Sequence, residues 1–323
     1  MYGVVLREFG PAGNLSYEEV DEPAPGKGEV RVAAEVSGVH QVETVVREGL
    51  AIGPPLPELP TVFGSEVAGV VDAVGEGVDP GWVGARVVTA MVRSGAYAEF
   101  VLADAAQLQV IPDGVSYETA VAMIRTGATT VGMLDIAGLT GEDTVLVTSA
   151  AGGIGRLLVQ HAHRLGATVV GAAGGAAKVG AVRALGADIA VDYRKPGWDG
   201  EVRDALGGRR VTAALDGVGG DIADAAFGLI ADHGRMVSIG ASSRTYFAAD
   251  PETLKERDIT VLNALTTMVS DPSRWPDMER RALEAAAKGD FVPTVQAFRL
   301  ADAAAAHTAL ARRETTGKVV LVP

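Results

Sequence analysis

The sequence predicts an α/β protein in which a β-rich domain is joined to a doubly wound parallel-sheet domain. Roughly the first hundred residues form short β segments separated by turn formers such as Pro23-Ala24-Pro25-Gly26 and Gly75-Glu76-Gly77. From about residue 113 onward, strands alternate with helices, which indicates right-handed βαβ units and a parallel sheet. The chain of 323 residues is long enough for two such domains.

Each element follows from its local pattern. In the first part, residues 29–36 alternate as a half-buried strand does, and residues 67–74 are rich in valine. In the second part, short β-branched runs predict strands, and apolar residues at helical spacing predict helices. The predicted strands cover residues 144–148, 168–171, 189–191, 211–215, 235–239, 259–262 and 318–322, with one more near Val295. The predicted helices cover residues 155–165, 177–185, 280–288 and 301–312.

The composition excludes several classes of protein. A net charge of −13 argues against a nucleic acid or an anionic membrane as partner, because both bind to basic faces. Without any cysteine, the chain has no disulfide, no thiolate nucleophile and no zinc site with Cys ligands. The N-terminus reaches charged residues too early for a signal peptide, and no segment offers the roughly 20 apolar residues of a membrane-spanning helix. We therefore expect a cytoplasmic protein.

Residues 144–160 are the most informative segment, because a strand there runs into a loop of small residues that opens a helix. A dinucleotide pyrophosphate needs this order, since it lies against backbone N–H groups at a helix N-terminus. A Gly-rich loop can also be only a tight turn, but the strand before it and the helix after it favour a cofactor site. The residues expected to bind the cofactor in this loop are Ala151, Gly152, Gly153, Ile154 and Gly155.

The next strand indicates which dinucleotide binds. An NAD site places an acidic residue about 20 residues further on, to hold the ribose 2′-hydroxyl. Residues 171–178 contain no acid, so nothing there would repel a 2′-phosphate. Lys178 follows shortly, and Tyr193-Arg194 ends the next strand, at the edge of that pocket. The pattern favours NADPH, with Lys178 and Tyr193 at the 2′-phosphate; the alternative for Lys178 is a solvated helix residue.

Several segments together resemble the zinc-independent, quinone oxidoreductase-like (ζ-crystallin type) branch of the medium-chain dehydrogenase/reductase superfamily. The resemblance implies a GroES-like catalytic domain in residues 1–120, an inserted Rossmann domain for NADPH in residues 121–264, and a return to the catalytic domain in residues 265–323. The segments that carry it, in the order of the family, are Gly64-Ser65-Glu66-Val67-Ala68-Gly69, Gly95-Ala96-Tyr97-Ala98-Glu99, Ala150-Ala151-Gly152-Gly153-Ile154-Gly155, Leu185-Gly186-Ala187-Asp188, Asp216-Gly217-Val218-Gly219-Gly220, residues 234–240 and Gly317-Lys318-Val319-Val320.

The resemblance also implies roles for single residues. In the zinc-dependent relatives, two metal ligands match His40 and Ser65, beside a Glu that matches Glu66; we expect no metal in this chain, because zinc needs three protein ligands at a catalytic site. In the zinc-free branch, a Thr that approaches the nicotinamide matches Thr129. Further residues expected at the cofactor are Lys178 and Tyr193 at the 2′-phosphate, Val218, Ile239, Gly240 and Ala241 along the nicotinamide and its ribose, and Lys318 near the C-terminus.

Among the five histidines, only His40 falls in the cleft that the resemblance implies. Its two interpretations are a proton donor and a hydrogen-bonded pocket wall. Glu66 is expected to bind backbone or a nearby arginine such as Arg47. His161 and His163 lie two apart on a predicted helix and face different sides. The remaining two, at positions 233 and 307, are expected to be structural.

The sequence therefore predicts an NADPH-dependent oxidoreductase that transfers hydride to a small quinone of one or two rings. The alternatives are a reductase of the C=C bond in an α,β-unsaturated carbonyl compound and an NADPH-binding sensor with little turnover. Since neither a quinone nor an enone product needs zinc to hold a bare alkoxide, the acceptor oxygen can be held by neutral donors. Zinc-free relatives commonly pair through their Rossmann domains, and the uncharged segment 259–265 suits an edge strand in such a homodimer.

Overall fold

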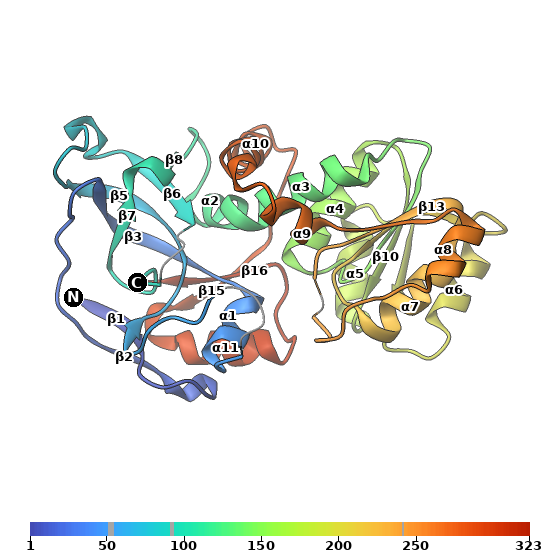
Figure 1. Ribbon diagram of the computed structural model, residues 1–323, viewed down its shortest axis with the longest axis horizontal. Helices are drawn as coiled ribbons and strands as arrows, with labels where there is room; N and C mark the ends of the chain where they lie inside the picture. The colour runs from blue at the N-terminus through green and yellow to red at the C-terminus, as the bar shows by residue number, and fades with distance from the viewer. Residues whose placement is uncertain (51–54, 91–93, 241) are drawn as a thin grey trace. The chain divides into compact units, whose positions relative to one another are not determined.

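The computed structural model describes residues 1–50, 55–90, 94–240 and 242–323. The chain divides into two compact units: unit 1 contains Met1–Arg125 and Glu279–Pro323, and unit 2 contains Thr126–Met278. The second crossing lies beyond residue 264, because the helix α9 (Ala264–Val269) packs on α3 (Ala128–Ala137) inside unit 2. The expected separation into a β-rich and a parallel-sheet domain is confirmed (Figure 1).

Unit 1 is built on a seven-stranded, mostly antiparallel sheet in the order β15-β16-β3-β5-β6-β8, with β7 paired to β3. A smaller sheet has the order β2-β1-β4. The strands are β1 (Tyr2–Leu6), β2 (Leu15–Glu19), β3 (Glu29–Val39), β4 (Thr61–Val62), β5 (Glu66–Val74), β6 (Arg86–Ala90), β7 (Phe100–Asp104), β8 (Gln109–Val110), β15 (Val295–Arg299) and β16 (Lys318–Val322). The helices are α1 (Gln41–Arg47), α2 (Tyr117–Ala122) and α11 (Ala303–Ala311).

The core of unit 1 that bears on function lies under α11. Leu6, Phe63, Tyr97 and Leu321 are at most 2% exposed and form one apolar cluster with alanines of α11. A cluster of this kind fixes the ends of β1 and β16 relative to the helix, because closely packed interiors resist displacement. The strand ends above it are therefore held in place.

Unit 2 is a six-stranded parallel sheet in the order β11-β10-β9-β12-β13-β14. The strand order reverses between β10 and β12, on either side of β9, and dinucleotides bind at such a reversal in doubly wound sheets. The strands are β9 (Thr144–Val147), β10 (Thr168–Ala173), β11 (Ile189–Asp192), β12 (Val211–Asp216), β13 (Ile230–Ser238) and β14 (Thr260–Asn263), and the helices are α3, α4 (Gly153–Arg164), α5 (Ala176–Ala184), α6 (Trp198–Ala205), α7 (Gly220–Leu229), α8 (Pro251–Arg257) and α9.

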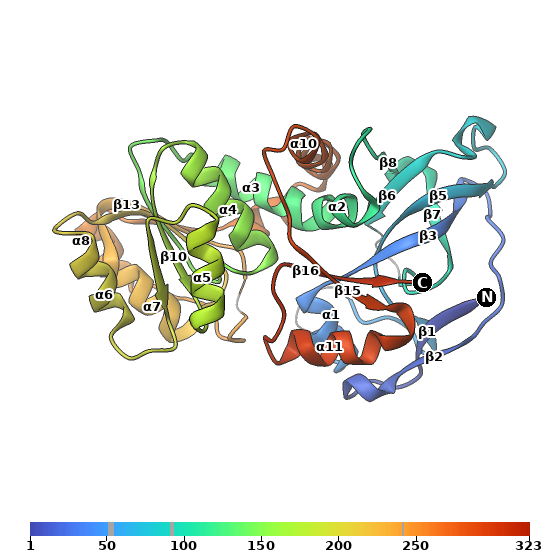
Figure 2. The same ribbon diagram turned by 180° about the vertical axis from the view of Figure 1, so that it is seen from behind.

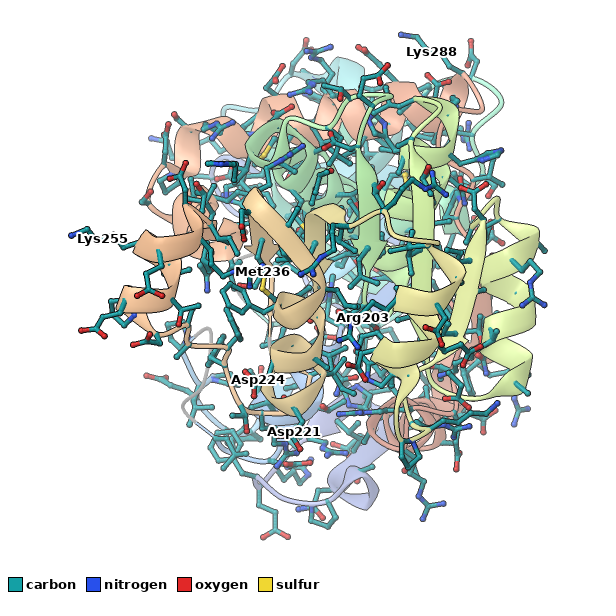
Figure 3. All side chains as sticks on the ribbon, turned by 90° about the vertical axis from the view of Figure 1, so that its right-hand side faces the viewer. Arg203, Asp221, Asp224, Met236, Lys255 and Lys288 are labelled. Atoms are coloured by element: carbon teal, nitrogen blue, oxygen red, sulfur yellow. The ribbon has the colours of Figure 1, made fainter. Side chains whose placement is uncertain are left out.

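Helices cover both faces of this sheet. Right-handed crossovers place α4 and α5 on one face and α6 and α7 on the other, as Figures 1 and 2 show from opposite sides. Figure 3 shows Arg203 of α6, and Asp221 and Asp224 of α7, pointing outward, while Met236 of β13 is fully buried. Each outer helix thus turns an apolar side to the sheet and a charged side to solvent.

The chain crosses between the units twice. The first crossing runs through a π-helical turn over Met123–Gly127, and the second through α10 (Trp275–Ala287). The strand predicted at 259–262 is observed at Thr260–Asn263, and the last two residues of the uncharged segment 259–265 begin α9 instead, because Asn263 caps that helix by accepting the N–H of Thr266 at 2.9 Å.

Candidate active site

Three polar residues of unit 1 meet where β3 ends and β5 and β16 begin. β16 pairs antiparallel with β3, with Val319 opposite Val39, so Lys318 lies beside His40. β5 also pairs antiparallel with β3, with Val67 opposite Ser37, which brings Glu66 to the same end. The register of two strand pairs therefore gathers residues that the sequence separates by up to 278 positions.

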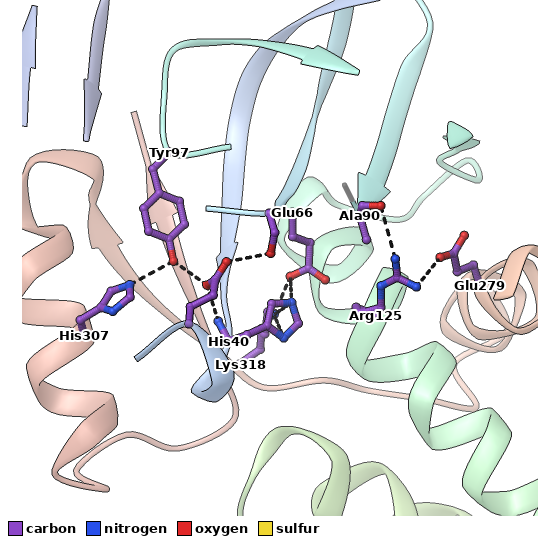
Figure 4. A network of polar contacts seen from close by, with 10 residues as sticks. His40, Glu66, Ala90, Tyr97, Arg125, Glu279, His307 and Lys318 are labelled. Carbon is purple, nitrogen blue, oxygen red and sulfur yellow. Dashed lines mark hydrogen bonds and ion pairs between the residues drawn. The ribbon is translucent and has the colours of Figure 1, made fainter. Parts of the chain in front are cut away.

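These three side chains form a compact charged cluster (Figure 4). The Lys318 ammonium lies 2.5 Å from Glu66 Oε2 and 3.1 Å from His40 Nε2, and His40 Nε2 lies 2.9 Å from the same carboxylate oxygen. The side chains of Glu66 and Lys318 are 0% and 4% exposed, whereas that of His40 is 20% exposed. His40 is thus the member of the cluster that reaches solvent.

Glu66 fits its buried position because Gly38 lies opposite it on β3. A Cβ at residue 38 would overlap the Glu66 carboxylate, so this close approach requires glycine. Burial alone raises the pKa of Glu66, but the neighbouring His40 and Lys318 outweigh burial and lower it to about 2. The carboxylate is therefore ionised. The expected contact between Glu66 and Arg47 is wrong, because the side chain of Arg47 is directed to the end of α1. Arg47 pairs with Glu48 instead.

A second, deeper network holds the backbone of His40. Glu43 accepts the N–H of His40 at 2.8 Å, the hydroxyl of Ser65 at 2.8 Å and the hydroxyl of Tyr97 at 2.7 Å. This reciprocal arrangement at the start of α1 is a capping box. It fixes the point at which β3 turns into α1, and hence the position of His40.

His307 completes this network inside the domain. Its Nε2 lies 3.1 Å from the Tyr97 hydroxyl oxygen, and because that hydroxyl gives its hydrogen to Glu43, the imidazole must donate. Burial lowers the pKa of His307 to about 4, and the same burial, with the Glu43 charge, raises that of Tyr97 well above its ordinary value. His307 is therefore a neutral structural residue, as the sequence predicts.

In unit 2, the loop after β9 has the geometry that the sequence predicts for a phosphate site. Ser149 takes a positive φ of 51°, and Gly152 then precedes the first turn of α4 as its N-cap. A Cβ at Gly155 would overlap the backbone of Ser149, so the close packing of helix on strand needs glycine there. The backbone N–H groups at the start of α4 have no intrahelical acceptor and are available to an anion.

At the ends of the neighbouring strands β10 and β11, a tyrosine and an arginine lie over two consecutive glycines. Tyr193 and Arg194, which follow β11, lie over Gly174 and Gly175 after β10, since a Cβ added at either glycine would approach them closely. Asp192 accepts the N–H of Gly175 at 2.9 Å and that of Arg194 at 3.1 Å. The Arg194 hydrogen bond, followed by the backbone donors, lowers the pKa of Asp192 to about 2. Gly175 has a φ of 101°, and a Cβ there would meet the guanidinium.

The loop after β12 is held in place by the buried side chain of Asp216. Asp216, 1% exposed, accepts the N–H groups of Val218 and Gly219 and the hydroxyl of Thr148. Burial raises the pKa of Asp216 despite these hydrogen bonds. Ile239 donates its N–H to the Asp216 carbonyl at 2.9 Å, so this loop and the end of β13 form one rigid edge. Val218 and Ile239 thus lie together at the carboxyl end of the sheet, next to the loop after β9.

The remaining expected site residues stand as follows. Thr129 is in the first turn of α3, 9% exposed, and its hydroxyl has no hydrogen-bond partner among the residues described. Lys178 is half-buried on α5. Ala241 lies outside the described residues. Lys318 was expected at the cofactor, and the structure shows it instead bonded to Glu66 and His40; any further contact with the cofactor stays a prediction.

Two features of the site were not among the predicted residues. Arg194, which the sequence placed with Tyr193 at the edge of the pocket without a role of its own, lies over the glycine pair. Arg125, in the π-helical turn, lies 3.3 Å from Glu279 and donates to the carbonyl of Ala90 (Figure 4). Burial raises the pKa of Glu279 to about 6, against the opposing effect of Arg125. No sequence pattern links these two residues.

Within the described part of the chain, no three His, Asp or Glu side chains are grouped as metal ligands would be. The same residues contain no helix that is both long and apolar enough to cross a membrane.

Comparison with known proteins agrees with both units. Residues 26–113 match the family model described as alcohol dehydrogenase GroES-like domain, and residues 153–284 match the one described as zinc-binding dehydrogenase. A quinone oxidoreductase of Pseudomonas aeruginosa is 33% identical over 98% of this chain and 97% of its own length. A 2-haloacrylate reductase of Burkholderia sp is 31% identical over 100% of this chain and 99% of its own length. The structure of Escherichia coli quinone oxidoreductase complexed with NADPH superimposes with a TM-score of 0.89, at 28% identity and over 100% of both chains.

Proposed function

This chain belongs to the medium-chain dehydrogenase/reductase family, in the branch of the quinone oxidoreductases, and from that premise we propose which reaction it carries out and with which residues. It is an NADPH-dependent oxidoreductase. The acceptor we propose is a small quinone, and the compartment we propose is the cytoplasm. The chain has no cysteine, so it forms no disulfide that would need an oxidising compartment.

The observation that carries the proposal is the surface of unit 2 at the ends of β9, β10 and β11. The loop of Ala151 to Gly155 offers free N–H groups to a pyrophosphate, and the guanidinium of Arg194 lies over Gly175, where a Cβ would collide with it. The guanidinium of Arg194 is on a side chain that is 64% exposed, so a 2′-phosphate can reach it. Tyr193 on the neighbouring glycine adds a flat surface. These residues fit NADPH.

NADPH, when bound, supplies the hydride. The residues of this chain hold and orient the reactants. Val218 and Ile239, on their rigid edge, provide an apolar wall along the nicotinamide ribose. Thr129 offers a hydroxyl that no other described side chain uses, and it orients the carboxamide end of the ring by hydrogen bonding.

His40 supplies the proton that reduction requires. Hydride addition leaves negative charge on the acceptor oxygen, and the imidazole is the solvent-reaching member of its cluster. A positioned acid contributes roughly 10²–10⁴ in rate, so His40→Gln lowers kcat within that range if the imidazole is the donor. If His40 is only a wall of the pocket, the same change alters KM more than kcat, and the proton comes from water.

A second acceptor class is favoured by one observation, the full-length similarity to a 2-haloacrylate reductase. Such an enzyme reduces a C=C bond next to a carbonyl group, and the resulting enolate can be held by the same neutral donors. Deuterated NADPH distinguishes the two. An enone product keeps deuterium at its β-carbon, whereas a hydroquinone loses the label to solvent on aromatising.

Turnover with a panel of quinones and enones tests the proposal as a whole. Activity with either class supports it and separates an enzyme from an NADPH sensor, which would bind the cofactor and turn over neither. If a simple alcohol or aldehyde is the only substrate that reacts, the proposal is wrong.

We further propose a homodimer through the edge of the unit 2 sheet. β14 has one neighbour, β13, in the sheet order, so its second side has unpaired backbone groups that another strand can bond. Leu265 and Val269 of α9, 41% and 57% exposed, lie next to it in sequence. Light scattering at micromolar concentration tests this: a monomer mass contradicts it.

A further inference from the structure

We propose that the outer edge of β7 (Phe100–Asp104) in unit 1 is a docking site for an extended basic peptide, which joins the sheet as an added strand. No residue assigned to the cofactor or to the acceptor lines this place, so the inference goes beyond the proposed function. It stands on an open strand edge, on a pocket beside that edge, and on the charge of the pocket.

β7 has a hydrogen-bonded neighbour on one side. Among the strands that the structure describes, it pairs with β3 alone (Figure 1). Ala105, directly after β7, donates its N–H to the carbonyl of Gly28, directly before β3. Because hydrogen bonding alternates along an antiparallel strand, every second residue of β7 directs its N–H and C=O groups away from β3. These residues are Phe100, Leu102 and Asp104, and such an edge can bond a further strand.

A pocket of about 400 Å³ lies along this open edge, a volume in the range of ligand sites. Residues of β7 line one side of it, and Met1, Val20 and Pro23 line another. Gly3 of β1 bridges to Ala98, just before β7, in antiparallel pairing. β1 thus borders the segment that leads into β7, and the pocket continues from Met1 along β7. A strand in the pocket would therefore extend the line of β1, antiparallel to β7.

The side of β7 that faces the core is apolar. Val101 and Ala103 are 1% and 3% exposed, and Met1 and Val62 pack against the cluster that contains Val101. Met1, Val62 and Ala103 also line the pocket. A peptide strand on this edge can therefore bury small apolar side chains on this side, which favours binding because apolar surface leaves water.

The opposite side of the strand is acidic. Asp104 pairs with Glu29 of β3, and both residues line the pocket together with Asp21. The carboxylate of Asp104 accepts the N–H of Ala106 at 2.9 Å and keeps its charge. Basic side chains of a peptide complement these carboxylates.

The cations near the pocket do not balance this charge. The described lining contains no lysine or arginine, and its cation is the ammonium of Met1, which donates to the carbonyl of Val20 at 3.2 Å. Three carboxylates against this ammonium leave the pocket negative. Arg31 lies over the ring of Phe100 and is paired with Asp72 at 2.8 Å. Since successive side chains of a strand point to opposite sides, the peptide that fits alternates apolar and basic residues.

The probe is an end-capped fluorescent peptide of about six residues, the length of an ordinary strand, that alternates valine and lysine. Fluorescence anisotropy measures its binding to a chain without added residues before Met1. We expect saturable binding that weakens as salt is added, and no binding when glutamate replaces lysine in the peptide. Absence of saturable binding of the valine–lysine peptide overturns the proposal.

N-methylated peptides separate strand pairing from attraction by charge. Residues directly opposite each other in paired strands share a side of the sheet, so the lysines lie opposite Phe100, Leu102 and Asp104 and their amides bond β7. Methylation of the lysine amides is expected to abolish binding, whereas methylation of the valine amides is expected to weaken it less. Equal binding of both methylated peptides and the parent shows adsorption by charge alone and overturns the proposal, as does the reverse order.

Hydrogen exchange locates the added strand in the wild-type chain. We expect the amides of Phe100, Leu102 and Asp104 to exchange about tenfold more slowly when the valine–lysine peptide is present. The amide of Val101, which is directed toward β3, is expected to keep its rate. Unchanged exchange at all three edge amides under saturating peptide overturns the proposal.

Variants of the edge and of the acids complete the test. Leu102→Pro removes an N–H that is directed away from β3, at an edge position where proline is tolerated, and is expected to weaken binding about tenfold. Asp21→Asn and Asp104→Asn are each expected to weaken it roughly two- to fivefold. Asp224→Asn, at an outward-facing residue of α7, is the matched control and is expected to leave it unchanged.

Unchanged affinity in all three pocket variants overturns the proposal. Circular dichroism checks that each variant is folded. If Leu102→Pro does not fold, the methylated peptides and the exchange of the edge amides decide the question with the wild-type chain.

Discussion

His307→Asn tests the buried network of unit 1 through the pH dependence of its stability. His307 is fully buried, and burial lowers its pKa from the ordinary 6.5 to about 4. Between pH 7 and pH 5 the unfolded chain therefore gains a proton at this residue, whereas the folded chain does not. Because the unfolded state binds more protons in this window, stability falls as the pH falls.

The size of the effect follows from the two values. For an imidazole that titrates at 6.5 unfolded and about 4 folded, the free energy of unfolding decreases by about 2 kcal/mol from pH 7 to pH 5. Glu279 has the opposite sign, because burial raises its pKa from 4.5 to about 6 and the folded state binds more protons. Between pH 7 and pH 5, Glu279 therefore offsets about 1 kcal/mol of the stability that is lost through His307. The lowered pKa of Glu66 changes the free energy of unfolding only below about pH 4.5, outside this window.

The assay is urea unfolding, followed by circular dichroism, at pH 7 and at pH 5. Asparagine does not titrate and can still donate to Tyr97. We therefore expect His307→Asn to lose about 2 kcal/mol less than the wild type between the two pH values, and Glu279→Gln to lose about 1 kcal/mol more. Equal losses in His307→Asn and wild type would refute the conclusion that His307 is held neutral in the fold.

The remaining predictions concern the cofactor and the metal. Arg194→Ala is expected to weaken NADPH at least tenfold with little effect on NADH, because a charge-assisted contact contributes about 1.5–3 kcal/mol; isothermal titration against both cofactors, with the outward-facing Arg203→Ala as control, measures it. Lys178→Ala is expected to do the same, and equal losses for NADPH and NADH would show that Lys178 does not touch the 2′-phosphate. Thr129→Val, which removes a hydroxyl without other described partners, is expected to lower kcat with the Kd of NADPH nearly unchanged, as stopped-flow measurements can show. Elemental analysis after dialysis is expected to find well under one zinc per chain; stoichiometric zinc whose removal abolishes activity would contradict this.

Local patterns in the sequence were sufficient for most of the fold. The parallel strands of unit 2 were predicted because β-branched runs alternate with helical spacing, and both patterns are set by neighbouring residues. The phosphate loop was predicted for the same reason, since strand, glycines and helix follow one another within residues 144–160. The uncharged segment 259–265 is only partly an edge strand, because a capping side chain, Asn263, starts a helix at Ala264 within it.

The resemblance to a family extended the predictions from elements to single residues, and the structure agrees with only some of them. It named His40, which is the member of the buried charge cluster that reaches solvent, and it named Val218 and Ile239, which lie on one edge of the sheet. Their roles at the substrate and the cofactor stay predictions. It placed Glu66 near the position of His40, but it gave no reason to connect Lys318 with either, and it suggested Arg47 as a partner of Glu66. The pairing depends on the register of β3 with β5 and β16, which no short segment contains.

The sequence by itself determined the fold class, the dinucleotide loop and the absence of cysteine ligands, because each depends on residue type and short spacing. Only the tertiary structure decided the charge cluster of unit 1. His40 and Lys318 are 278 residues apart, and they meet because antiparallel pairing aligns the end of one strand with the start of another. Burial then sets their chemistry, since a carboxylate such as Glu66 remains ionised away from water only when cations are brought to it. Those cations come from other strands, so this chemistry exists only in the folded chain.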